Sequence, residues 1–285
     1  MAVVTSVEDA YAYCRRITHR YGANFSVGFR FLPRVKRRAV YAAYAWCRQA
    51  DDIADEPGSD ILPRLEAWQA ELDSCYEGSP SHPITIALAD SLRYFPIPKE
   101  AFVALVDGCR QDLVKIRYAD FAELLVYCDL VASSISDISL SIFGYTNPEA
   151  TSWGRNLSTA LQLTNITRDI GDDLDRDRIY LPATELAQFG VTEEDLRART
   201  RSRAMEEMIL FQVDRAEDYF RRAEPLLKEL AFDARFPTLL MGAVYARVLE
   251  KIRAEPFAPL ERRISLSTGE KVGLVLGRVL QPHFV

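Results

Sequence analysis

The sequence predicts an all-α protein made of a single domain, and three observations lead to this prediction. Proline and glycine interrupt the chain at intervals, and the segments between them carry apolar residues at helical spacing. Alternating strand patterns are nearly absent. The 285 residues are 48% apolar and 27% charged, which is a globular composition able to bury a large core. We therefore expect one catalytic domain over residues 1–285.

Seven helices are expected from the positions of the breakers. The first begins at Pro33, which we place at the first helical position, and ends near Glu56. The others are expected over residues 61–76, 98–114, 121–143, 147–173, 201–230 and 238–253. Pro237 is interpreted as a breaker before the last helix. No short repeat is visible, so a solenoid is not expected.

Composition excludes several classes of function. A net charge of −6 and a pI near 5.3 argue against a nucleic-acid partner. The five cysteines form no CxxC pair and are expected to be buried thiols, while the three scattered histidines do not suit a metal site or a triad. No signal segment and no uncharged apolar run of spanning length is visible. We expect a cytoplasmic protein that at most rests on a membrane, with no obligate protein partner.

Two acidic clusters are the most informative feature of the chain. Carboxylates recur four residues apart in residues 51–55 (DDIAD) and 169–173 (DIGDD), and this spacing places them on one side of a helix. Helical phase adds Arg48 to the first face, and Gln162, Asn165 and Asp177 to the second. A solvated face would explain either cluster alone. Because both have apolar neighbours and lack interspersed Lys, the pair favours a Mg²⁺ site.

The chemistry that suits two opposed acidic faces is the departure of diphosphate from an allylic carbon. Metal ions neutralise the leaving group, and an apolar cavity shields the carbocation from water. Arg48 and Arg168 are positioned to bind phosphate oxygens or to form ordinary Arg–Asp pairs. Residues 126–144, rich in Ala and Ser, either allow close helix packing or leave room for a long apolar ligand.

Four stretches of the chain resemble the squalene and phytoene synthases, which join two prenyl diphosphates head to head. They are residues 24–33 (NFSVGFRFLP), 41–56 (YAAYAWCRQADDIADE), 162–182 (QLTNITRDIGDDLDRDRIYLP) and 245–271 (YARVLEKIRAEPFAPLERRISLSTGEK). The third stretch, ending in RIYLP, is the most specific. The resemblance implies the all-α isoprenoid-synthase fold, which is a helical bundle around a central cavity.

The resemblance also implies roles for particular residues. The implied Mg²⁺ ligands, with Mn²⁺ as a substitute ion, are Asp51, Asp55, Asn165, Asp169 and Asp173. The implied substrate contacts are Tyr21, Gly22, Ala23, Asn24, Tyr44, Arg48, Gln162, Arg168 and Tyr245. The four aspartates, Arg48 and Tyr44 form the expected catalytic set. Arg262 or Arg263 is a further candidate, because the local alignment can slip by one residue.

The implied reaction passes through a cyclopropylcarbinyl diphosphate, and we expect two geranylgeranyl diphosphates to give phytoene. The alternatives are a farnesyl diphosphate enzyme that makes squalene, presqualene diphosphate or dehydrosqualene, a class I terpene cyclase, and a non-catalytic assembly factor. NADPH is expected only if the product is squalene. A hydrocarbon product is nearly insoluble in water, so transient membrane contact is expected.

One stretch departs from the family pattern. In residues 127–136 (YCDLVASSIS), Asp129 replaces an aromatic residue and serines replace glycines. The resemblance implies that this helix lines the cavity, so these replacements are expected to bear on product identity.

Overall fold

The protein is a bundle of helices in the computed structural model, which describes residues 6–21, 28–56, 60–278, 283 and 284. Its first half contains α1 (Val7–Tyr21), α3 (Arg34–Asp55), α4 (Ile61–Tyr76), α5 (Pro83–Leu92), α6 (Lys99–Asp112), α7 (Phe121–Cys128), the π-helical turn η1 (Asp129–Ser133) and α8 (Ser134–Phe143). Its second half contains α9 (Ala150–Arg168), α10 (Ile170–Leu174), α11 (Ala183–Phe189), α12 (Glu193–Arg197), α13 (Arg203–Ala223), α14 (Leu226–Glu229), α15 (Phe232–Ala254), α16 (Ala258–Glu261) and α17 (Thr268–Arg278). Only two isolated β-bridges occur among these residues.

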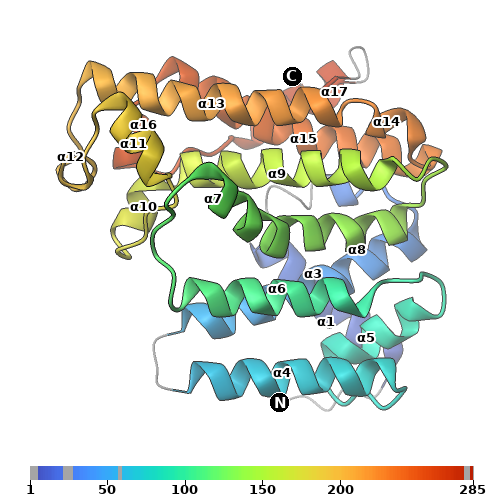
Figure 1. Cartoon of the computed structure of the whole chain (residues 1–285). Coiled ribbons are helices and arrows are strands. Elements are labelled where there is room, and N and C mark those ends of the chain that lie inside the picture. Colours follow the sequence, from blue (N-terminus) through green and yellow to red (C-terminus); the bar gives the residue numbers. More distant parts are fainter. Residues whose placement is uncertain (1–5, 22–27, 57–59, 279–282, 285) are drawn as a thin grey trace.

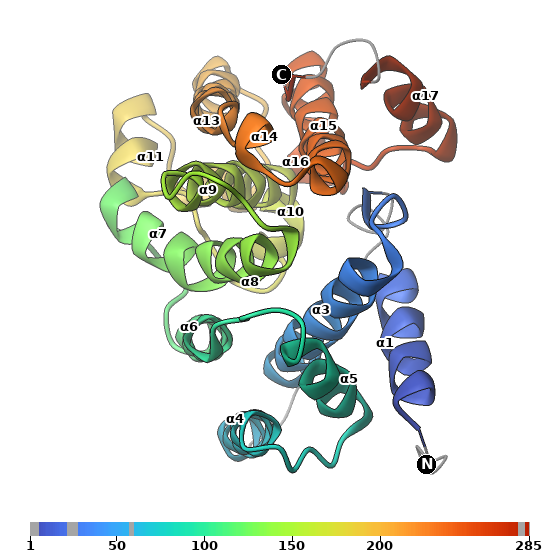
Figure 2. The same cartoon turned by 90° about the vertical axis from the view of Figure 1, so that its right-hand side faces the viewer.

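The long helices lie side by side in Figure 1, and Figure 2 looks along the bundle. Helix α9 packs against α8, α13 and α15, while α3 packs against α1, α5 and α6. The centre of the bundle is therefore bordered by α3 and α8 on one side and by α9 and α15 on the other (Figure 2). All five cysteines are buried and free, as predicted.

Most of the predicted helices are present, although residues 201–230 form two helices, α13 and α14, and the sequence did not predict α1, α5, α11, α12, α16 or α17. Helix α4 has the predicted bounds, but Pro33 is the N-cap of α3 rather than its first residue. The helix predicted over residues 147–173 is divided, because Asp169 leaves helical geometry (φ −101°, ψ 14°). Helix α15 starts at Phe232 and continues through Pro237, which lies early enough in the helix that few turns are disturbed.

Helix α3 is held in place by small residues and by one large aromatic side chain. Buried alanines along α3 allow its neighbours to approach closely. Trp46 is fully buried, with its ring 5.7 Å from that of Trp68 and 4.9 Å from that of Phe102. This aromatic cluster fixes the rotation of α3, so the charged residues near its C-terminal end face the bundle centre.

The segment Phe121–Phe143 is the one helix of the described residues that is long and apolar enough to cross a membrane by length and composition. It lies within the bundle instead, where η1 and α8 pack against α6 and α9. A Cβ added to Gly154 of α9 would lie 2.6 Å from Ser136 Oγ and 2.7 Å from Leu140 Cδ1. Ser136 therefore serves close helix packing, which was one of the two interpretations of this small-residue segment.

Candidate active site

The first acidic cluster lies at the C-terminal end of α3. Asp51 is largely enclosed, and the Cys109 thiol donates to its Oδ1 at 3.6 Å. Burial raises the pKa of Asp51 to about 7, and the charge of Arg48 and the Cys109 hydrogen bond offset that rise only in part. Asp52, one residue further, forms an ion pair with Arg48. Asp55 is more exposed and marks the rim of the site.

The second cluster is centred on Asp169, between α9 and α10. Arg168 donates from Nε and Nη2 to the two carboxylate oxygens of Asp169 at 2.7 and 2.5 Å. Arg263 Nε lies 3.1 Å from Asp169 Oδ1. Burial and the neighbouring Asp169 charge raise the pKa of Asp173 to about 7. The cluster thus contains one carboxylate that is strongly paired and one that is buried with little compensation.

Gly171 explains why the second cluster reads DIGDD. A Cβ at this position would lie 2.7 Å from the Leu260 carbonyl oxygen, so only glycine lets α10 approach α16 this closely. The contact fixes α10 against α16, and α16 leads directly to Arg263. This places the Arg263 side chain in contact with Asp169, whereas Arg262 forms an ion pair with Glu255.

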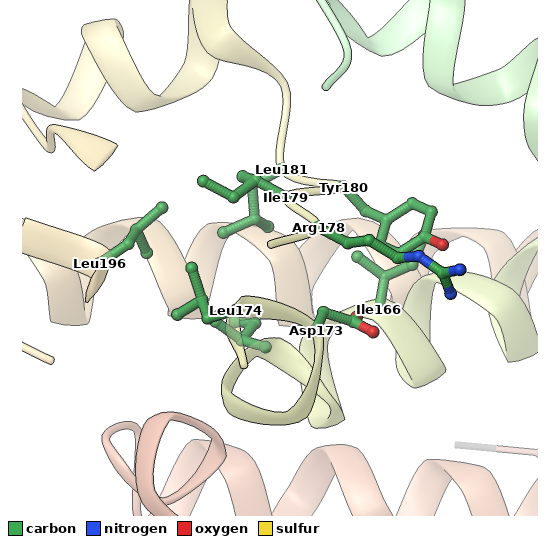
Figure 3. A pocket seen from close by; sticks show the side chains of 9 residues that line it. Ile166, Asp173, Leu174, Arg178, Ile179, Tyr180, Leu181 and Leu196 are labelled. Atoms are coloured by element: carbon green, nitrogen blue, oxygen red, sulfur yellow. The ribbon is translucent and has the colours of Figure 1, made fainter. Parts of the chain in front are cut away.

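Two arginines connect the clusters. Arg178 Nη1 lies 3.6 Å from Asp55 Oδ1, and Arg176 Nη1 lies 3.9 Å from Asp55 Oδ2. In Figure 3 the Asp173 carboxylate and the Arg178 guanidinium extend to the same side of a small pocket. The carboxylates of α3 and α10 therefore share a cationic neighbour, although more than a hundred residues separate them in the sequence.

A buried network behind Arg178 was missed by the sequence analysis. The hydroxyls of Tyr127 and Tyr180 each donate to the Asp112 carboxylate at 2.9 Å. Burial raises the pKa of Asp112, while these hydrogen bonds and the Arg178 charge oppose that rise. The RIYLP stretch could have indicated Arg178 and Tyr180 as site residues. It gave no indication of Asp112, which lies far from it in the sequence. The network holds Arg178 at the rim of the site.

The predicted substrate-contact residues surround the arginines. The Arg48 guanidinium lies 4.8 Å from the Tyr21 ring centroid, which brings the end of α1 to the first cluster. Burial raises the pKa of Tyr44 and raises that of Tyr245 to about 12, and Arg168 hydrogen-bonds with the Tyr245 hydroxyl. These two tyrosines stay protonated near neutral pH. Gly22, Ala23 and Asn24 lie outside the described residues.

Asn165 offers an oxygen that no described residue uses. Its Nδ2 donates to Gln162 Oε1 at 3.4 Å, while its Oδ1 is buried and has no hydrogen-bond partner among the described residues. A buried acceptor in this state costs about 1 to 3 kcal/mol unless a ligand engages it. In the described part of the chain, no three acidic, His or Cys side chains converge into a closed metal site. Separate oxygen donors on two faces fit Mg²⁺, which shares its coordination with water and phosphate.

Comparison with known proteins identifies the family. A profile of squalene/phytoene synthases matches residues 18–270. The chain belongs to this family. The 15-cis-phytoene synthase of Synechococcus elongatus is 35% identical over 283 residues, covering 94% of this chain and 92% of that relative. The chloroplastic phytoene synthase 2 of Solanum lycopersicum is 34% identical and covers 93% of this chain and 88% of its own.

Solved structures of the family have the same fold. A squalene synthase from Alicyclobacillus acidocaldarius superposes with a TM-score of 0.83 at 32% identity, covering 88% of this chain and 95% of that one. A dehydrosqualene synthase solved with a ligand gives 0.89 at 26% identity, covering 95% of both chains. The predicted all-α isoprenoid-synthase fold is therefore confirmed. As a member of the squalene/phytoene synthase family, the protein is a prenyltransferase.

Asp177 does not lie on the acidic face predicted for it. The helix has already ended, and Asp177 adopts a left-handed conformation with φ 58°. Its carboxylate forms ion pairs with Arg117 and Arg197 on the outer surface. Arg168, for which phosphate binding and an Arg–Asp pair were both considered, is buried and paired with Asp169.

Asp129 lies away from the bundle centre, contrary to the expectation that it faces a central cavity. It is exposed and accepts a hydrogen bond from Ser133 at 2.8 Å. Together with Arg155 and Tyr219 it lines an outer groove of about 380 Å³ between η1, α9 and α13. The physical reason is helical phase, because Tyr127 and Cys128 are buried and the next residue, Asp129, falls on the outer side of the helix.

Proposed function

We propose that this prenyltransferase condenses two prenyl diphosphates head to head, and that two geranylgeranyl diphosphates give phytoene through a cyclopropylcarbinyl diphosphate. The observation that carries the proposal is the meeting of two acidic faces at a shared arginine, next to an amide oxygen without a partner. Three similar proteins, from Synechococcus elongatus, Arthrospira platensis and a Synechocystis strain, are named phytoene synthases, which supports the choice of substrate.

We assign the metal ligands on the same basis. Asp51 and Asp55 would hold Mg²⁺ from α3, and Asn165, Asp169 and Asp173 would hold it from α9 and α10. Bound Mg²⁺, or Mn²⁺ in its place, neutralises the diphosphate as the allylic carbon–oxygen bond breaks. The raised pKa of Asp51 and of Asp173 supports this assignment, since buried carboxylates whose charge nearby arginines offset only in part are typical of functional sites.

The arginines of the site would exchange partners when substrate binds. Arg48, Arg178 and Arg263 each contact a carboxylate at the edge of the acidic faces. If Asp55 and Asp169 ligate metal, Arg178 and Arg263 would be free to donate to phosphate oxygens, while Arg48 would stay beside them, paired with Asp52. The Tyr245 hydroxyl accepts a hydrogen bond from Arg168, and the rings of Tyr44 and Tyr245 would limit the entry of water.

A farnesyl diphosphate enzyme is the second candidate. The structural similarity to a squalene synthase at 32% identity and to a dehydrosqualene synthase favours it. In that case squalene formation would require NADPH, and dehydrosqualene or presqualene diphosphate would not.

Product analysis distinguishes these candidates. Purified protein is incubated with geranylgeranyl or farnesyl diphosphate and Mg²⁺, with and without NADPH, and the lipid product is identified by mass spectrometry. We expect phytoene from the first substrate without NADPH. A cyclic product from one substrate molecule would indicate a terpene cyclase. If neither diphosphate is consumed, an assembly role gains support and the proposal is wrong.

We further infer that the protein works in the cytoplasm and touches a membrane when its product leaves. The reason is chemical, because a long hydrocarbon has no stable place in water. Its acidic composition gives no support to nucleic-acid binding.

A further inference from the structure

Large apolar side chains gather on the surface at the end of the bundle remote from the acidic clusters. We call this surface the aromatic end and define it by Phe31, Val35, Tyr145, Phe232 and Phe236. Phe232 is 87% exposed, and Phe31 and Val35 are each about half exposed. The rings of Phe31 and Phe236 are 5.1 Å apart in an edge contact. Exposed apolar residues are common singly, but a contiguous group signals an interaction.

Specific contacts bring these residues together from three parts of the chain. Lys36 Nζ donates to Asp233 at 2.6 Å and to the Phe143 carbonyl at 2.8 Å. These bonds join the first turns of α3 and α15 to the end of α8. The Ala231 N–H donates to the Gly144 carbonyl at 2.9 Å, so the residues that follow each, Phe232 and Tyr145, are neighbours. Figure 2 looks onto this end of the molecule.

The same surface is basic in a protein that is acidic overall. Residues 30–38 read RFLPRVKRR, with five cations and no acid, whereas the whole chain has a net charge of −6. Arg34 and Arg38 share the single carboxylate of Glu8. The remaining arginines here are not neutralised.

Their hydrogen bonds go to uncharged groups. Arg37 donates to the Arg30 carbonyl at 3.1 Å, and Arg235 donates to the backbone carbonyls of residues 230 and 228. None of Arg30, Arg37 and Arg235 forms an ion pair with a carboxylate in the described residues. A backbone carbonyl does not cancel a charge, so the aromatic end keeps a positive potential.

We propose that the aromatic end docks on the surface of an anionic lipid bilayer. Exposed aromatic rings enter the headgroup region, where their apolar faces leave water, and arginines beside them contact lipid phosphates. The lipid phosphate supplies the negative charge that the arginines lack within the protein. A second copy of this chain suits the surface less well, since two such ends would bring like charges together.

The orientation of this docking rests on the proposed function. From Asp51 back to Arg34, α3 rises about 26 Å toward the aromatic end. An apolar product formed beside Asp51 and lying along α3 would therefore point its tail at the lipid, while the diphosphate end stays in water. The surface itself is defined by exposure and charge, so binding can be tested without turnover.

Vesicle co-sedimentation of the full chain tests the proposal. Vesicles of phosphatidylcholine with phosphatidylglycerol are compared with vesicles of phosphatidylcholine alone. We expect binding to the anionic vesicles that decreases with salt. Arg30→Gln with Arg37→Gln should weaken it, since each arginine near such a surface contributes about 1 kcal/mol, or roughly fivefold in affinity. Phe31→Ser with Phe232→Ser should reduce binding to both kinds of vesicle.

Val114→Ser is the matched control, because Val114 is 83% exposed but follows α6 near the acidic end. It should leave vesicle binding unchanged, and circular dichroism melting checks that each variant folds. The proposal is overturned if the wild-type protein does not bind anionic vesicles. It is also overturned if Val114→Ser loses as much binding as the variant with Phe31→Ser and Phe232→Ser. A third contrary result is light scattering that shows a dimer for the wild-type protein and a monomer for the Phe variant, because the surface would then be a dimer interface. Turnover of detergent-dispersed substrate is measured separately, so a failure of the proposed function would be seen independently of vesicle binding.

Discussion

Replacing Asp51 by Asn is expected to stabilise the fold of the metal-free protein, whereas replacing Asp169 by Asn is expected to destabilise it. Asp51 forms no ion pair within the described residues, and burial raises its pKa to about 7. Its ionised form therefore destabilises the fold near neutral pH. Asp169 instead holds the buried Arg168 through two hydrogen bonds and also contacts Arg263. One carboxylate opposes folding and the other supports it.

The magnitudes follow from these environments. Moving the pKa of Asp51 from its ordinary 3.8 to about 7 corresponds to an upper limit on the order of 4 kcal/mol at neutral pH. Water entry reduces this cost, so we expect Asp51→Asn to raise the free energy of unfolding by about 1 to 2 kcal/mol. Asp169→Asn leaves the Arg168 guanidinium buried and poorly paired, which costs about 3 kcal/mol. For a chain of 285 residues, these values correspond to a rise of about 2 to 3 °C and a fall of about 5 °C in Tm.

Melting followed by circular dichroism in EDTA measures both shifts. The folded-state pKa of Asp51 is raised, so its destabilising effect is absent below about pH 4 and grows as pH rises toward 7. The rise in Tm caused by Asp51→Asn should therefore be present at pH 7.5 and be smaller at pH 5. Both variants should lose Mg²⁺-dependent turnover, while Asp172→Asn, at an exposed position in the same cluster, should keep its Tm. A fall in Tm for Asp51→Asn as large as that for Asp169→Asn would refute the reasoning.

Three further substitutions test the supporting structure by urea unfolding. Arg215→Ala leaves the buried Glu185 carboxylate without its ion pair, and we expect a loss of about 3 kcal/mol, whereas a loss below 1 kcal/mol would contradict it. Burial opposes ionisation of Glu71, but hydrogen bonds from nearby hydroxyl and backbone N–H groups outweigh it and lower its pKa to about 2. Its contribution is present above pH 4.5 and disappears as pH falls toward 2, so Glu71→Gln should cost about 1 kcal/mol at pH 7 and nothing at pH 2. Gly154→Ala forces a methyl group against Leu140 and should cost about 1 to 3 kcal/mol, and an unchanged urea midpoint would show that α8 yields easily.

Local pattern was sufficient to find the acidic faces and most long helices. The four-residue spacing of the aspartates and the apolar periodicity of α3 and α4 are properties of neighbouring residues, so the sequence displays them directly. The break at Asp169 was not visible in the same way. It coincides with ion pairs to Arg168 and to Arg263, and Arg263 lies 94 residues further along the chain.

The other features that were missed also depend on distant contacts. Asp112 acquires its place in the site from Tyr180, 68 residues away. Phe232 has the apolar side chain of an ordinary core residue. It is exposed because α15 packs against α9 and α13 and its first turn is held to α3 by the Lys36–Asp233 ion pair. Helix α1 was not predicted either, although its helical periodicity is nearly as clear as that of α3, so in this case a local signal was overlooked.

The π-helical turn η1 divides Phe121–Phe143 into two halves with different angular phase. One additional residue rotates everything after Ser133 by about 100° relative to an uninterrupted α-helix. The first half can then direct Tyr127 to Asp112, while the second half directs Ser136 to Gly154. Deleting a single residue in η1 would restore an uninterrupted α-helix and leave both halves on their present faces, whereas deleting a residue within α8 would rotate the residues beyond the deletion away from their contacts. This helix should therefore tolerate the loss of one residue within η1 far better than the loss of one residue within α8.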